Sequence, residues 1–104
     1  MITVTYAEGD KDISLSVEGH AGYAQGEDIV CSAVSILVQT LLAYLIAEDL
    51  KPSYTLKKGD THIFAEGDKA HTAFLVIMTG LKLMEDTFPD HIRLVRGCCM
   101  QMKP

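Results

Sequence analysis

Two stretches near the start of the chain alternate between apolar and polar residues. Threonines alternate with larger apolar residues over 2–7, and serines do the same over 13–18. A period of two residues puts successive side chains on opposite faces of a strand. The polar, glycine-containing residues 8–12 separate the two stretches. The pattern therefore predicts a β-hairpin with one apolar face.

Two longer segments carry apolar residues at helical spacing and predict helices over 29–48 and 69–87. Asp28 and Asp68 precede them as predicted N-caps, and a proline follows each segment. The second helix has a clear apolar face, made of Ala70, Phe74, Ile77, Leu81 and Met84.

Three more alternating stretches predict strands at 53–58, 61–66 and 91–96, and Gly59-Asp60 joins the first two of them. The element order is then ββαββαβ, which lacks the regular strand–helix alternation of a parallel sheet. We expect an α+β fold, in which two helices pack on one face of an antiparallel sheet. Residues 1–104 are few enough to form a single domain.

Composition narrows the possible partners. Lys and Arg total 9 and Asp and Glu total 14, so the net charge is −5. Nucleic acid needs clustered Lys and Arg, so we expect no direct nucleic-acid partner. Hydrophobic residues make up 48% of the chain, more than one sheet face needs, so we expect part of the helix surface to be buried in a homodimer.

A membrane span is the main alternative for residues 29–47, which carry no charge. Ser32, Ser35 and Gln39 interrupt this run, and its flanks are acidic on both sides, without the positive-inside signal of a membrane helix. The N-terminus has no signal-peptide pattern, and the odd cysteine count is not a disulfide framework. We therefore expect a cytoplasmic protein without a membrane partner.

Cys31 and His20 are the candidate catalytic residues. With Asp28 as N-cap, Cys31 is the third helical residue, close to the unpaired N–H groups and the positive end of the helix dipole, which favour thiolate. The glycine-containing loop after His20 can bring the imidazole to the sulfur, and such a pair suits nucleophilic acyl transfer. The alternative is a small buried cysteine and an ordinary surface histidine.

Other residues of this segment have supporting roles in the prediction. Ser35 lies one helical turn after Cys31 and can hydrogen-bond a substrate or a catalytic group. Asp28 either caps the helix or orients the His20 ring. Tyr23 is a loop aromatic that can line a substrate cleft.

No metal site and no cofactor are predicted. The remaining histidines and cysteines include His62, His71, His91, Cys98 and Cys99, but none forms a Cys-x-x-Cys or His-x-x-x-His pair. Structural zinc sites usually show such spacing. No phosphate-binding glycine motif is present either.

The residues Gly-His-Ala at 19–21, followed by Gly-x-Asp-Ile-Val-Cys and Ala-Val-Ser, resemble the ribosomal-processing cysteine proteases of the Prp family. The resemblance places the catalytic pair on His20 and Cys31, and the family's flanking glycine, aspartate and serine on Gly19, Asp28 and Ser35. Ser32 stands where the family commonly has alanine.

This resemblance implies a homodimeric α+β cysteine endopeptidase. Its expected substrate is the precursor of a bacterial large-subunit ribosomal protein, the twenty-seventh in the standard count, whose N-terminal extension is removed. Three alternatives stay open from the residues alone: a non-catalytic ribosome-associated module, a dimerisation domain and a thiol oxidoreductase.

Overall fold

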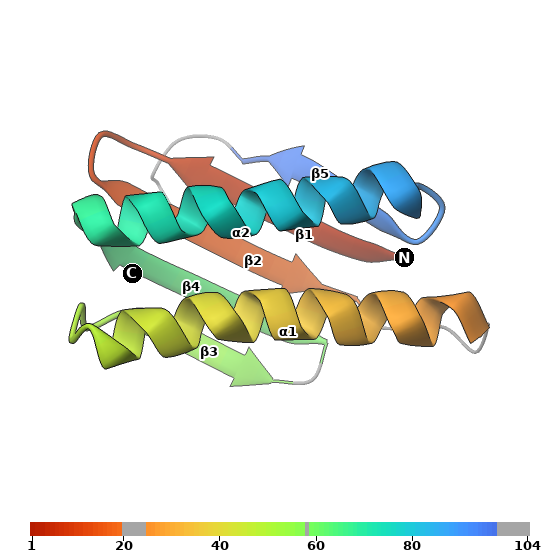
Figure 1. The fold of residues 1–104 in the computed structure, drawn as a ribbon, viewed down its shortest axis with the longest axis horizontal. Coiled ribbons are helices and arrows are strands. Elements are labelled where there is room, and N and C mark those ends of the chain that lie inside the picture. Colours follow the sequence, from red (N-terminus) through yellow and green to blue (C-terminus); the bar gives the residue numbers. More distant parts are fainter. Residues whose placement is uncertain (20–24, 58, 98–104) are drawn as a thin grey trace.

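The computed structural model, which describes residues 1–19, 25–57 and 59–97, begins with the predicted hairpin. Its strands are β1 (Ile2–Glu8) and β2 (Asp12–Glu18). The remaining elements follow in the predicted order, as α1 (Gln25–Ala47), β3 (Ser53–Lys57), β4 (Asp60–Glu66), α2 (Asp68–Thr87) and β5 (Ile92–Arg96). The two helices lie side by side over one face of the sheet (Figure 1). The predicted α+β architecture is therefore confirmed.

The sheet is mixed, whereas we expected it to be antiparallel. Its strand order is β3-β4-β2-β1-β5, and every neighbouring pair is antiparallel except β1 with β5. The parallel pair follows from α2, which crosses the sheet from β4 and returns the chain to the end where β4 began. β5 consequently runs in the same direction as β4 and β1.

The core lies between the sheet and the helices. Alternate strand residues such as Val4, Leu15 and Ile63 are buried on the helix-facing side. Phe74 of α2 is the largest of the fully buried side chains. The predicted apolar face of α2 is buried as expected, with Met84 partly buried at its end. Gly80 of α2 leaves room for the Leu37 side chain of α1, so the two helices approach closely there.

Both helix starts differ from the prediction. α1 begins at Gln25, so Asp28 is inside the helix and is not its N-cap. α2 begins at Asp68, and its N-cap is Gly67, which has no side-chain capping bond. Acidic residues also stabilise the first turn of a helix, because they interact with the positive end of the helix dipole. An aspartate near a helix start can therefore lie inside the helix instead of capping it.

Residues Ile29–Ala47 of α1 have the length and composition of a membrane span, as the sequence suggested. In the fold, one stripe of this segment belongs to the core between the helices and the sheet, and about a third of the apolar stretch is buried. The buried stripe consists of Val30, Val34, Val38, Leu41, Leu42 and Leu45. The opposite stripe of the helix, which includes Ile29 and Ile36, is exposed.

Candidate active site

Cys31 lies well inside α1, six positions after Gln25 and therefore about 9 Å along the helix axis. We expected it at the third helical position, and that expectation is wrong because the helix begins earlier. The field of the helix dipole falls off within the first turn, so the dipole activates this thiol less than we expected. At this depth an α-helix pairs each backbone N–H with a carbonyl four residues earlier, so free amides of the helix start do not surround the sulfur.

The Cys31 side chain sits at one edge of the buried stripe. It is a free cysteine, half-buried, and packs against the hydrophobic core. Ser35 follows one turn later on the same face and is also half-buried, whereas Ser32 is exposed. Because Leu37 marks the edge that faces α2, helical spacing puts Cys31 and Ser35 on the other edge, toward β3. The predicted proximity of Cys31 and Ser35 is thus confirmed.

The strand β3 offers an exposed edge on that side of the molecule. It is the outermost strand of the sheet, and all five of its residues are exposed. Tyr54 and Leu56 are each 51% exposed although they pair with buried Ile63 and Thr61 on the helix-facing side. This edge combines unpaired backbone groups with two large apolar side chains. An extended peptide can add to such an edge as a further strand.

Gly19 fixes the end of β2, immediately before the predicted catalytic histidine. Its φ is 98°, a conformation that favours glycine, and its N–H donates to the Gly59 carbonyl oxygen at 3.1 Å. The predicted residues His20 and Tyr23 lie outside the described residues, as does the side chain of Asp28. The structure therefore brings together Cys31 and Ser35, and gives Gly19 a clear conformational role.

Outside this segment, one cluster escaped the sequence reasoning. Glu18, Asp60 and His62 come together across two neighbouring strands. Glu18 is distant in the sequence from Asp60 and His62, and the register of β2 with β4 brings it beside them. No local spacing pattern could have found them.

A half-buried thiol at the edge of a core helix, in a fold whose outer strand can accept a peptide, is compatible with a cysteine peptidase. The model of the family described as cysteine protease Prp matches residues 1–93. The chain belongs to this family, and it is a cysteine protease whose relatives process ribosomal proteins.

Solved structures share this fold. The chain is similar to the essential ribosomal processing protease Prp from S. aureus in complex with a substrate peptide, with 24% identity and a TM-score of 0.80. The same protease with a covalently linked product peptide gives 25% identity and a TM-score of 0.79. Both alignments cover 93% of this chain and 100% of the other.

A protein from Streptococcus mutans has 24% identity and a TM-score of 0.78, with coverage of 92% of this chain and 93% of the other. A comparison with curated protein sequences gave no significant match.

Proposed function

We propose that this protease uses Cys31 as nucleophile and His20 as general base to cleave a ribosomal protein precursor. The observation that carries the proposal is the family match over residues 1–93, which includes both residues. The thiol of Cys31, which is free and only half-buried, supports it. Because the free N–H groups of the helix start do not surround the sulfur, the His20 imidazole would contribute more than the helix dipole to forming the thiolate.

The reaction would proceed by acyl transfer. The Cys31 thiol gives its proton to His20, and the thiolate attacks the scissile carbonyl carbon. The C–N bond then breaks, the leaving amine takes the proton from His20, and a thioester remains. Water attacks the thioester with His20 as base, which releases the new carboxylate and restores the thiol.

Supporting roles fall to the other residues of the segment. Ser35 lies one turn after Cys31 on α1, and its hydroxyl would donate a hydrogen bond to substrate or to the developing oxyanion. Asp28, which is not the helix cap, would orient the His20 ring. Tyr23 would line the substrate cleft, and Gly19 would hold the segment that carries His20.

The proposed substrate is the precursor of the twenty-seventh large-subunit ribosomal protein, and the bond cut would release its N-terminal extension. The protease carries a net charge of −5, which attracts a basic ribosomal protein. Tyr54 and Leu56 on the exposed β3 edge would contact an apolar extended segment. Because ribosomes assemble in the cytoplasm, the protease would act there, without a cofactor.

Selective alkylation tests the proposed nucleophile. Iodoacetamide should modify Cys31 faster than Cys98 or Cys99, and loss of protease activity should follow the modification of Cys31 in proportion. His20→Ala should slow the alkylation of Cys31, because it removes the base. Peptide mapping by mass spectrometry would identify the modified residue. Full activity after complete alkylation of Cys31 would overturn the proposal.

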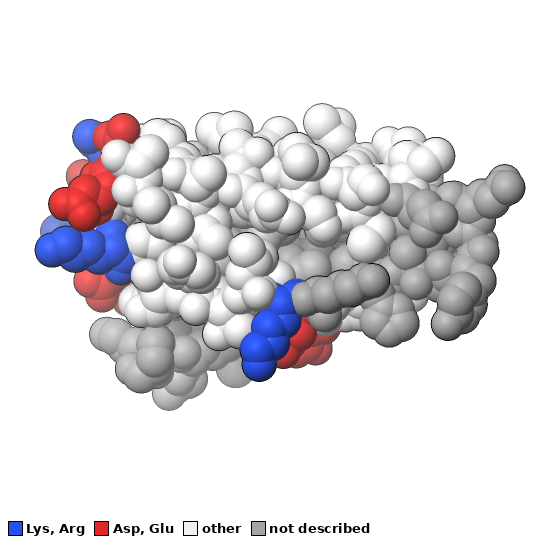
Figure 2. All heavy atoms as spheres, turned by 90° about the horizontal axis from the view of Figure 1, so that it is seen from below, with Lys and Arg blue, Asp and Glu red and all other residues white. Residues whose placement is uncertain are grey.

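A homodimer is the second part of the proposal, and it rests on the outward faces of the two helices. Four large aliphatic residues there are each more than 60% exposed: Ile29 64%, Ile36 65%, Val76 64% and Leu83 63%. Viewed from the side of α1 and β3, Lys, Arg, Asp and Glu gather at one end and at one point near the rim, and the described surface between them is uncharged (Figure 2). The apolar character of the outward helix faces comes from the four exposed aliphatic side chains, and exposed apolar surface of this kind marks interfaces.

Sedimentation velocity at micromolar concentration tests the dimer. Ile36→Asp would bury a charge in the interface, so it should weaken dimerisation at least tenfold. Val95→Asp on β5, where the native side chain is 38% exposed, is the matched control and should leave the dimer intact. A wild-type monomer at micromolar concentration would contradict the proposal.

A further inference from the structure

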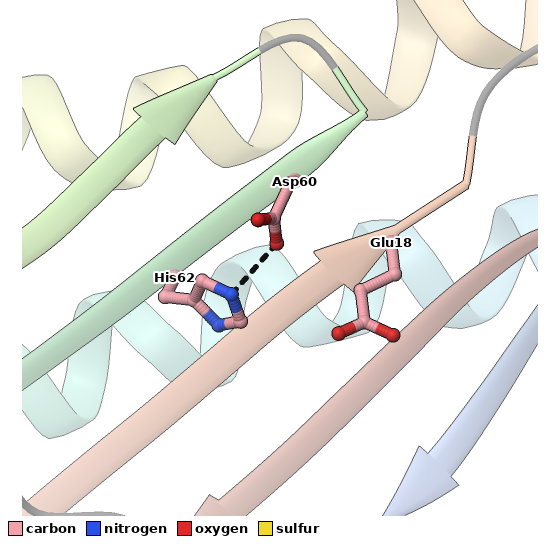
Figure 3. A group of neighbouring side chains, drawn as sticks. All are labelled: Glu18, Asp60 and His62. Atoms are coloured by element: carbon pink, nitrogen blue, oxygen red, sulfur yellow. Dashed lines mark ion pairs between the residues drawn. The ribbon is translucent and has the colours of Figure 1, made fainter.

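Three side chains that can ligate a metal gather on the face of the sheet that the helices leave open. Glu18 ends β2, while Asp60 and His62 belong to the first half of β4 (Figure 3). One ligand atom from each residue lies within 4.8 Å of the others. The cluster combines an imidazole with two carboxylates, which is a mixed donor set and not merely an acidic patch.

The imidazole of His62 is held in place by a residue outside the cluster. The Ser16 hydroxyl is hydrogen-bonded to Nδ1 of His62 at 2.8 Å. The other ring nitrogen, Nε2, therefore faces the carboxylates and lies 2.7 Å from Oδ1 of Asp60. Histidines that ligate metals usually have such a partner on the second nitrogen, because it fixes the ring orientation. Ser16 and His62 are direct cross-strand partners, so the sheet register maintains this contact.

The two carboxylates of the cluster come from directly paired positions on neighbouring strands. Glu18 and Asp60 are direct cross-strand partners, and like charges placed opposite each other destabilise a sheet. His62 contacts Asp60, and Lys57 is the cross-strand partner of Asp60 on its other side. Within the described part of the chain, no ion pair or hydrogen bond engages the Glu18 carboxylate. A cation between Glu18 and Asp60 would relieve this repulsion.

We propose that Glu18, Asp60 and His62 bind a zinc ion. Zn²⁺ accepts imidazole and carboxylate ligands at about 2.0–2.2 Å, and small rotations of these exposed side chains would bring the three ligand atoms to that distance. Imidazole favours Zn²⁺ over Mg²⁺, which prefers oxygen ligands. All three side chains are exposed, so water can reach the fourth coordination position.

The site has a consequence for the segment that follows it. Gly19 and then His20 come directly after Glu18 in the chain. A zinc ion would fasten the end of β2 to β4 where this segment begins, and binding to the folded state alone would raise the melting temperature. The site is distinct from Cys31 and does not depend on the proposed protease mechanism. Our expectation of no metal site rested on local sequence spacing, which does not reveal ligands brought together by strand pairing.

The test measures Zn²⁺ binding in a folded protein without cysteine. Cys31, Cys98 and Cys99 are replaced with alanine, because thiolates bind zinc by themselves. Isothermal titration calorimetry with Zn²⁺ should show one site per chain, and Mg²⁺ should bind at least tenfold more weakly. Zn²⁺ should also raise the melting temperature of this variant. Because the variant lacks Cys31, the outcome is separate from that of the protease proposal.

Substitutions in the same background identify the ligands. Glu18→Gln and His62→Ala should each weaken Zn²⁺ binding at least tenfold. Ser16→Ala should weaken it about tenfold, because it frees the imidazole to rotate. His91→Ala is the control, since His91 lies before β5 and outside the cluster, and it should bind Zn²⁺ like the parent. Circular dichroism confirms that each variant is folded.

Two results would overturn the proposal. One is the absence of Zn²⁺ binding at millimolar concentration in the cysteine-free protein. The other is binding that His62→Ala and Glu18→Gln leave unchanged, or that His91→Ala reduces as strongly as they do.

Discussion

Gly19→Ala should damage both stability and activity, and Gly67→Ala provides a matched comparison. Both glycines have positive φ, at 98° and 111°. A Cβ added at Gly19 would press against the backbone carbonyl oxygen of Met1, whereas a Cβ at Gly67 would meet nothing within 4 Å. The two substitutions therefore impose similar backbone strain, but only Gly19→Ala adds a collision with backbone.

The free-energy difference follows from these two contributions. A residue other than glycine at positive φ costs about 1–3 kcal/mol, and alanine recovers about 0.5 kcal/mol by restricting the unfolded chain. Gly67→Ala should thus lose about 0.5–2.5 kcal/mol of the free energy of unfolding. Overpacking typically adds about 1–3 kcal/mol, so Gly19→Ala should lose about 1.5–5.5 kcal/mol and be the less stable of the two variants by about 1–3 kcal/mol.

Activity should separate the two variants further. Gly19 directly precedes His20, and a displacement of about 1 Å in a catalytic group can reduce the rate by about 100-fold. Urea denaturation would give the two free energies of unfolding, and kcat/KM for precursor cleavage would give the activities. Gly67→Ala should keep the wild-type kcat/KM. If Gly19→Ala were no less stable than Gly67→Ala and equally active, the conformational role of Gly19 would be refuted.

Two further predictions concern the fold. Phe74→Ala should lower the free energy of unfolding by about 3–5 kcal/mol in urea denaturation, because Phe74 is 1% exposed; Leu75→Ala, where the native residue is 44% exposed, should lose far less. A hydrogen bond from the backbone N–H of Leu94, and then one from Lys82, lower the pKa of Glu85 below its ordinary value of 4.5. The ionised Glu85 therefore stabilises the fold fully above pH 4.5, and this stabilisation is lost as the pH falls below that value. Glu85→Gln should therefore cost about 1 kcal/mol at pH 7, and its deficit should shrink in denaturation at pH values below 4.5; an equal deficit at both pH values would contradict this.

Most of the fold could be predicted because local patterns determine it. The period-two stretches became β1, β2 and β4, and the helical spacing of α2 identified the residues that are buried. The start of α1 could not be placed from the sequence, because Asp28 has the residue type of an N-cap and also suits the first turn of a helix. The parallel pairing of β5 with β1 depends on the path of α2 across the sheet, which no local pattern records.

The candidate site could be predicted in part for the same reason. Cys31 and Ser35 share a helix face, and helical spacing is sufficient to predict that. The depth of Cys31 in α1 and the exposure of the β3 edge depend on tertiary structure. The cluster around His62 depends on strand register, so a sequence search for closely spaced ligands missed it.

The central claim is that Cys31 and His20 process a ribosomal protein precursor. The most direct measurement incubates the protease with the precursor of the twenty-seventh large-subunit ribosomal protein and determines the N-terminus of the product by mass spectrometry. The wild type and a Cys98→Ala/Cys99→Ala control should release the N-terminal extension at one bond. Cys31→Ala and His20→Ala, folded like the wild type, should leave the precursor intact. Cleavage at the same bond by Cys31→Ala at the wild-type rate would contradict the account.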